Sequence, residues 1–138
     1  MKYLVDVNVL SEPMKAAPSL QVIQWLKANE RQLAVDPVII SEIRLGINLM
    51  SDGKRKRALD EWFTRGIANL VCIPIDMATG LRWAQLLARL REDGQTMPLK
   101  DSLIAATALT HGLTVVTRNV KDFEKAGVEM LNPFDSIK

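Results

Sequence analysis

Residues 100–117 read KDSLIAATALTHGLTVVT and place a helix, a stop signal and a strand in direct succession. Leucine and alanine dominate the first part of this stretch, which predicts a helix over about residues 100–111. Gly112 ends that helix, because glycine readily adopts the left-handed conformation that follows a helical C-terminus. The apolar run 113–116 predicts a buried strand, and the polar Thr117 follows it directly. This order predicts a domain in which helices connect parallel strands.

The same alternation runs through the rest of the chain. Further strands are predicted at residues 2–5, 33–35, 70–73 and 129–131. Further helices are predicted at residues 19–29, 38–50, 54–66 and 77–92. Short strands separated by longer helices are typical of an α/β fold with a central parallel sheet flanked by α-helices. No repeat or linker divides the chain, so we expect one domain over residues 1–138.

The predicted helix 77–92 has a clear beginning and an apolar stripe. Asp76 is well placed to cap its first turn. The residues that form the stripe are Met77, Leu81, Ala84 and Ala88.

Composition excludes several classes of protein. The chain has 138 residues, of which 48% are hydrophobic and 25% charged, so disorder, collagen-like repeats and a membrane protein are disfavoured. The net charge of +2 is not the strong basic field of many nucleic-acid binders. The single cysteine, Cys72, lies in an apolar run and is predicted to be a buried thiol. No export signal or spanning segment is visible, so we expect a cytoplasmic protein without membrane contact.

Polar side chains follow two of the predicted strands. Asp6 comes directly after strand 2–5, and Thr117 and Asn119 follow strand 113–116. In open parallel sheets the ligand crevice lies beyond the carboxyl ends of the strands. Two separate segments would therefore bring polar groups to the same edge of the sheet.

Three more acids each have an ordinary structural explanation. Glu42 could point out of its apolar helix, Asp101 could simply favour a helix N-terminus, and Asp122 could be a loop or capping acid. Considered together with Asp6, they are acids from well-separated segments that could converge on one crevice. Hard oxygen ligands of this kind select Mg²⁺ or Mn²⁺ rather than zinc.

A resemblance to a known family covers essentially the whole chain. Its blocks are LVDVN at 4–8, SEIRLG at 41–46, KDSLIAATA at 100–108, VTRN at 116–119 followed by Asp122-Phe123, and the closing LNP at 131–133. In these blocks the chain resembles the PIN-domain ribonucleases, specifically the VapC-type toxins of bacterial toxin–antitoxin pairs. The resemblance implies a PIN domain that cuts RNA with Mg²⁺ or Mn²⁺, forms a homodimer and is held inactive by a VapB-type antitoxin.

The chain departs from the family pattern at three positions. Val7 stands where family members often have threonine, and Ile39 stands where a hydroxyl residue is common. Asn119 stands where aspartate is common, so either Asn119 or Asp122 would fill the fourth acidic position.

The mechanism expected from these residues is hydrolysis of RNA by a metal-activated water. No histidine lies in any block, so a general base of that type is missing. The predicted catalytic residues are Asp6, Glu42, Asp101 and Asp122. Asp6 and Asp101 would bind the metal directly, and Glu42 would bind it through water or orient the attacking water. The side chains predicted to support these carboxylates by hydrogen bonds or to complete the polar site are Asn8, Thr117 and Asn119.

Two other functions remain open on the sequence. A phosphoryl-accepting receiver domain would need an acidic pair near the first strand, and Val7-Asn8 follow Asp6 instead. The other alternative is a non-catalytic RNA- or partner-binding module on the same fold. The basic run 54–57 could grip RNA phosphates or simply form a solvated helix start.

Overall fold

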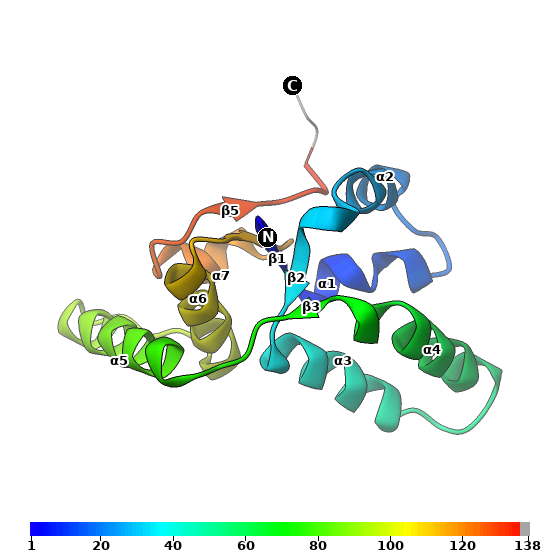
Figure 1. The fold of residues 1–138 in the computed structure, drawn as a ribbon, viewed down its shortest axis with the longest axis horizontal. Helices are drawn as coiled ribbons and strands as arrows, with labels where there is room; N and C mark the ends of the chain where they lie inside the picture. The colour runs from blue at the N-terminus through cyan, green and yellow to red at the C-terminus, as the bar shows by residue number, and fades with distance from the viewer. Residues whose placement is uncertain (136–138) are drawn as a thin grey trace.

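A computed structural model describes residues 1–135 and has a five-stranded parallel sheet at its centre (Figure 1). The strand order is β3-β2-β1-β4-β5, and every neighbouring pair is parallel. The strands are β1 (Tyr3–Val5), β2 (Leu33–Val35), β3 (Val71–Cys72), β4 (Thr114–Val116) and β5 (Met130–Leu131). The predicted α/β class is confirmed, and each predicted strand is present, several of them one or two residues shorter.

Helices fill the connections between the strands. The α-helices are α1 (Val7–Leu10), α2 (Leu20–Ala28), α3 (Pro37–Asn48), α4 (Lys54–Arg65), α5 (Met77–Glu92), α6 (Leu99–His111) and α7 (Val120–Glu124). Three short 3-10 turns are η1 (Glu12–Met14), η2 (Glu30–Gln32) and η3 (Ile67–Asn69). The short helices α1 and α7 were not anticipated, because four or five residues are too few to show helical periodicity.

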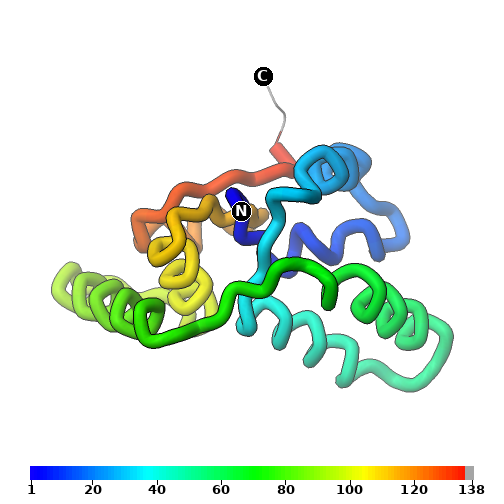
Figure 2. Tube along the Cα trace, in the orientation of Figure 1, coloured from blue at the N-terminus to red at the C-terminus, as the bar shows by residue number. Residues whose placement is uncertain are grey.

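The helices lie on both sides of the sheet. α1 to α4 lie on one side, and α5, α6 and α7 lie on the other (Figure 1). The green segment that follows β3 carries the chain from the first side to the second (Figure 2). The two layers bury an apolar core in which Leu4, Val35, Ile39 and Val115 are fully covered. The C-terminal segment lies beside α2, where the Gln21 side chain donates a hydrogen bond to the Pro133 carbonyl (3.0 Å).

The position of β1 decides where a site can form. The chain leaves β1 toward β2 and β3, and it returns to β4 on the opposite flank of β1. Tyr3 pairs with Leu33 on one flank and with Thr114 on the other. Such a reversal opens a crevice beyond the carboxyl ends of the strands. In this chain the reversal lies where β1 ends at Val5 and β4 ends at Val116.

Helix α5 corrects one expectation. Asp76 caps it as predicted, with the Thr79 N–H donating to Asp76 Oδ1 at 3.1 Å. The predicted apolar stripe, however, lies in solvent: Met77 is 81% exposed and Leu81 62%, and Ala84 and Ala88 are exposed as well. The face that packs toward the core carries Thr79, Leu86 and Leu90. Because α5 packs mainly on α6, only one narrow face of the helix is covered. The spacing of the apolar residues alone did not identify that face.

Cys72 corrects another expectation, since its side chain is exposed rather than buried. It lies on β3, which is the edge strand of the sheet, and an edge strand is covered less than a central one. No helix within residues 1–135 is long and apolar enough to cross a membrane.

Candidate active site

Asp6 occupies the corner between β1 and α1. Its Oδ1 accepts the N–H of Val7 (2.8 Å), so the carboxylate caps the first turn of α1. Its Oδ2 accepts the hydroxyl of Thr117 (2.8 Å) and the amide of Asn8 (3.4 Å). Burial raises the pKa of Asp6, and these hydrogen bonds oppose that rise. Asp6 is 7% exposed, and its hydrogen bonds hold the carboxylate in one orientation.

Thr117 connects Asp6 to the segment after β4. Besides donating to Asp6, its oxygen accepts from the Asn8 amide (3.4 Å) and from the Asn119 N–H (3.1 Å). The side-chain oxygen Oδ1 of Asn8 accepts the backbone N–H of Arg118 (3.1 Å). Asn8 and Thr117 thus contact Asp6 through their side chains, as the sequence predicts. Asn119 takes part through its backbone N–H.

Asp101 lies in the first turn of α6. Burial is the main cause that raises its pKa to about 6, followed by the charges of Asp6, Asp122 and Glu42. The charge of the neighbouring Lys100 opposes this rise. The charges of Asp6, Asp122 and Glu42 thus act on Asp101, although the four acids come from separate segments of the chain.

Glu42 lies on α3 and is half-buried rather than pointing freely outward. Burial raises its pKa, Lys100 lowers it, and the charges of Asp6 and Asp36 raise it further. Asp122 lies in the first turn of α7 and adds to the negative potential at Asp6 as well as at Asp101. The four predicted catalytic acids therefore share one electrostatic environment.

Asp36 is an acid at this edge that sequence reasoning did not select. It follows β2 as Asp6 follows β1, and its Oδ1 caps α3 by accepting the Ile39 N–H (3.0 Å). Its Oδ2 accepts the hydroxyl of Thr107 (2.8 Å), and burial raises its pKa. The signal was present, because Val35-Asp36-Pro37 repeats the pattern of an acid directly after a strand.

The chemistry of these donors suits a hard divalent cation. Carboxylate oxygens line the edge, whereas zinc prefers sulfur and imidazole nitrogen. Among residues 1–135, no three acidic, histidine or cysteine side chains stand close enough to enclose a metal ion. Mg²⁺ does not require such a cage, because it usually keeps several waters and uses one or two carboxylates. The donor set therefore fits Mg²⁺ with water in part of its coordination shell.

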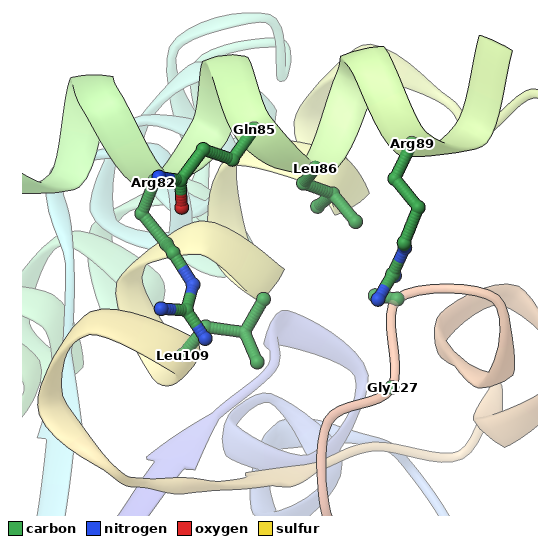
Figure 3. Close-up of a pocket in the computed structure, with 7 residues that line it drawn as sticks. Arg82, Gln85, Leu86, Arg89, Leu109 and Gly127 are labelled. Carbon is green, nitrogen blue, oxygen red and sulfur yellow. The ribbon is translucent and has the colours of Figure 1, made fainter. Parts of the chain in front are cut away.

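A cavity elsewhere on the surface differs from the acidic edge in the chemistry of its lining. A cavity of about 400 Å³ opens between α5, α6 and the loop before β5, where Arg82 and Arg89 point from α5 toward Leu109 and Gly127 (Figure 3). Its remaining lining residues are Gln85, Leu86 and Ala126. Gly127 precedes β5, so this cavity lies toward the amino ends of the strands. Its lining contains no carboxylate, and it cannot supply the metal-binding chemistry of the other edge.

Known proteins resemble this chain over nearly its whole length. Toxin FitB of Neisseria gonorrhoeae is 33% identical over 135 residues, which are 95% of this chain and 97% of FitB. VapC ribonuclease Y4jK of Sinorhizobium fredii is 33% identical over 137 residues, which are 96% of this chain and 97% of Y4jK. The solved structure of FitAB bound to an IR36 DNA fragment superposes with a TM-score of 0.91 at 31% identity, covering 99% of this chain and 98% of that chain.

The sequence profile of the PIN domain matches residues 3–129, which include all the acids described above. By this match and by the identities to its relatives, the chain belongs to the PIN domain family.

Proposed function

We propose that this chain is a Mg²⁺- or Mn²⁺-dependent endoribonuclease that acts as the toxin of a VapBC-type toxin–antitoxin pair. The observation that carries the proposal is the contact between Asp6 after β1 and Thr117 after β4 (2.8 Å), together with the mutual charge effects of Asp6, Glu42, Asp101 and Asp122. Burial, and after it the charges of Asp6, Asp122 and Glu42, raise the pKa of Asp101 to about 6. The names of two relatives, a toxin and a VapC ribonuclease, support the same function.

Each acid has a distinct part in this proposal. Asp6 and Asp101 hold the cation, and the hydrogen bonds from Thr117 and Asn8 keep the Asp6 carboxylate aimed into the crevice. A bound divalent cation neutralises the charge of the phosphate and lowers the pKa of water. Glu42 orients the attacking water, and its raised pKa suits a carboxylate oxygen that accepts a proton.

The fourth acidic position goes to Asp122 in this proposal. Its charge raises the pKa of both Asp6 and Asp101, so it lies close enough to contribute to the same negative potential. Asn119 is neutral, and its backbone N–H is engaged by Thr117.

Two protein partners complete the proposal. A VapB-type antitoxin is one, in line with the FitAB complex among the solved structures. A second copy of the chain is the other, and it fits the exposed apolar face of α5 around Met77 and Leu81. Light scattering during gel filtration should show a dimer, and Leu81→Glu should shift it toward the monomer.

The activity is tested by incubating the purified chain with single-stranded RNA. We expect cleavage in Mg²⁺ or Mn²⁺, none in EDTA, and none by Asp101→Asn in Mg²⁺. Asp52→Asn is the matched control, because Asp52 is a fully exposed acid and its loss should leave cleavage unchanged. RNA that binds but stays intact in both metals would reject the nuclease and favour a non-catalytic binding module.

A further inference from the structure

Arg118 follows Thr117 directly, at the edge of the sheet where Asp6 lies. The backbone N–H of Arg118 donates to the Asn8 side chain (3.1 Å), and the hydroxyl of the preceding Thr117 donates to Asp6. Lys100, in contrast, lowers the pKa of both Glu42 and Asp101, so its charge acts on the carboxylates themselves. The charge of Arg118 lowers the pKa of Glu12 instead, and Glu12 already forms an ion pair with Lys15. Arg118 therefore carries a positive charge one residue beyond Thr117, whose hydroxyl donates to Asp6.

The guanidinium of Arg118 is nevertheless held in place. Its Cζ lies 4.4 Å from the centre of the Phe134 ring, which is a cation–π contact. Phe134 is partly buried against the core, and its N–H donates to the Asn132 side chain (3.0 Å). Gln21 ties the same turn to α2 through the Pro133 carbonyl (3.0 Å). A guanidinium fixed on a ring loses little further freedom when it binds a ligand.

Two other arginines of the chain use their charge in ion pairs. Arg44 pairs with Asp60 at 2.6 Å, and Arg65 pairs with Glu61 at 3.1 Å. Within the part of the chain that the structure describes, Arg118 makes no ion pair and its side chain is exposed. A planar guanidinium with free N–H groups matches the paired oxygens of a phosphate.

We propose that the Arg118 guanidinium, held on the face of Phe134, binds a backbone phosphate of the single-stranded RNA substrate beside the bond that is cut. This assignment rests on the proposed function and names a substrate-binding group for the same site. The acids cannot bind a phosphate without help, because they are negative themselves. A fixed cation at the rim attracts the RNA strand while the carboxylates stay free for the metal ion.

The test measures RNA binding apart from cleavage. Fluorescence anisotropy with a single-stranded RNA oligonucleotide is recorded over a range of KCl concentrations, with every variant carrying Asp101→Asn. We expect Arg118→Ala to weaken binding about tenfold and to reduce the slope of log K against log salt by about 0.7, the value for one phosphate contact on a single strand. Arg118→Lys should keep the slope and bind less tightly, because lysine lacks the planar fork.

Arg82→Ala is the matched control. Arg82 is also an exposed arginine, but it lies in the α5 cavity away from the acids, and its loss changes the net charge equally. It should leave both affinity and slope as they are. Phe134→Leu should weaken binding about threefold with the slope retained, since the charge stays but its support is lost.

Kinetics without Asp101→Asn separate binding from chemistry. Arg118→Ala should raise KM about tenfold and change kcat less than about twofold. Equal effects of Arg118→Ala and Arg82→Ala would overturn the assignment, and so would a fall in kcat at constant KM. Weaker capture of a co-expressed antitoxin with unchanged RNA binding would overturn it in favour of a protein ligand. A wild-type chain that cuts no RNA would reject the nuclease, while anisotropy would still decide on Arg118.

Discussion

Asp6, which follows β1, and Asp36, which follows β2, make the same kinds of hydrogen bonds but differ in their exposure to solvent. At both corners, an aspartate follows a parallel strand, caps a helix with Oδ1 and accepts a threonine hydroxyl with Oδ2. At Asp6 the partners are Val7 N–H and Thr117. At Asp36 they are Ile39 N–H and Thr107. Asp6 retains 7% exposure, whereas Asp36 is fully covered.

The difference follows from the position of each corner in the sheet. Asp6 lies between β2 and β4, at the reversal of strand order, where the crevice opens and where Asp101 and Asp122 add their charges. Asp36 follows the next strand, β2, and its carboxylate accepts the hydroxyl of Thr107 from α6. The same local pattern therefore serves a cation site at one corner and a structural cap at the other, and the following predictions test that distinction.

The largest effect is expected for Asp6→Asn compared with Asp36→Asn. Asparagine keeps the capping oxygen in both cases, but at position 6 it removes a charge that would hold the cation. We expect Asp6→Asn to lose at least about 100-fold in RNA cleavage, because changing even a group that only supports a metal ligand can cost that much. Asp36→Asn should lose less than about tenfold. Initial rates in saturating Mg²⁺ measure this, and equal losses would make Asp36 part of the site.

The loss of stability should be larger for substitution of Asp36 than of Asp6, the reverse of the order expected for cleavage. Asp36→Ala removes the cap of α3 and a buried partner of Thr107, so we expect the free energy of unfolding to fall by about 2–3 kcal/mol. Asp6→Ala should cost less than about 1 kcal/mol, because removing its charge also relieves repulsion with the neighbouring acids. Urea unfolding at neutral pH without divalent metal measures both. A larger loss for Asp6→Ala would contradict the division of roles.

The crowding of acids should also appear as a pH dependence. The pKa of Asp101 is raised from its usual 3.8 to about 6, so the folded state binds its proton more tightly than the unfolded chain does. Stability without metal should therefore fall as the pH rises from about 4 to about 6, by about 2 kcal/mol at most.

Thermal unfolding across this pH range measures the loss, and Asp101→Asn should remove most of it. Millimolar Mg²⁺ at neutral pH should recover stability in the wild type but much less in Asp101→Asn, because metal that binds only the folded state stabilises it. A wild type whose stability is unchanged by both pH and Mg²⁺ would show that Asp101 is neither buried among the acids nor bound to the cation.

The smallest effect is expected for the two threonines. Thr117→Val removes the hydroxyl that orients Asp6 and should lower cleavage about tenfold with little change in stability. Thr107→Val should cost about 1 kcal/mol of stability and leave cleavage unchanged. The same two assays apply, and a loss of cleavage in Thr107→Val would show that the Asp36 corner supports catalysis.

The sequence by itself determined the order of elements and the placement of most acids. Short apolar runs such as 113–116 and the periodic stretch ending at Gly112 carry local signals of strand, helix and stop, so the α/β class could be predicted. Asp6 and Thr117 could be assigned to one edge because both follow predicted strands.

Only the tertiary structure decided which of these groups share a site. The burial of Asp36, the exposure of Met77 and Cys72, and the contact of Arg118 with Phe134 depend on strand order and on which helix covers which face. Asp6 and Asp36 have nearly the same local sequence context. Their difference arises because long-range packing closes one corner and leaves the other open, which no pattern of neighbouring residues encodes.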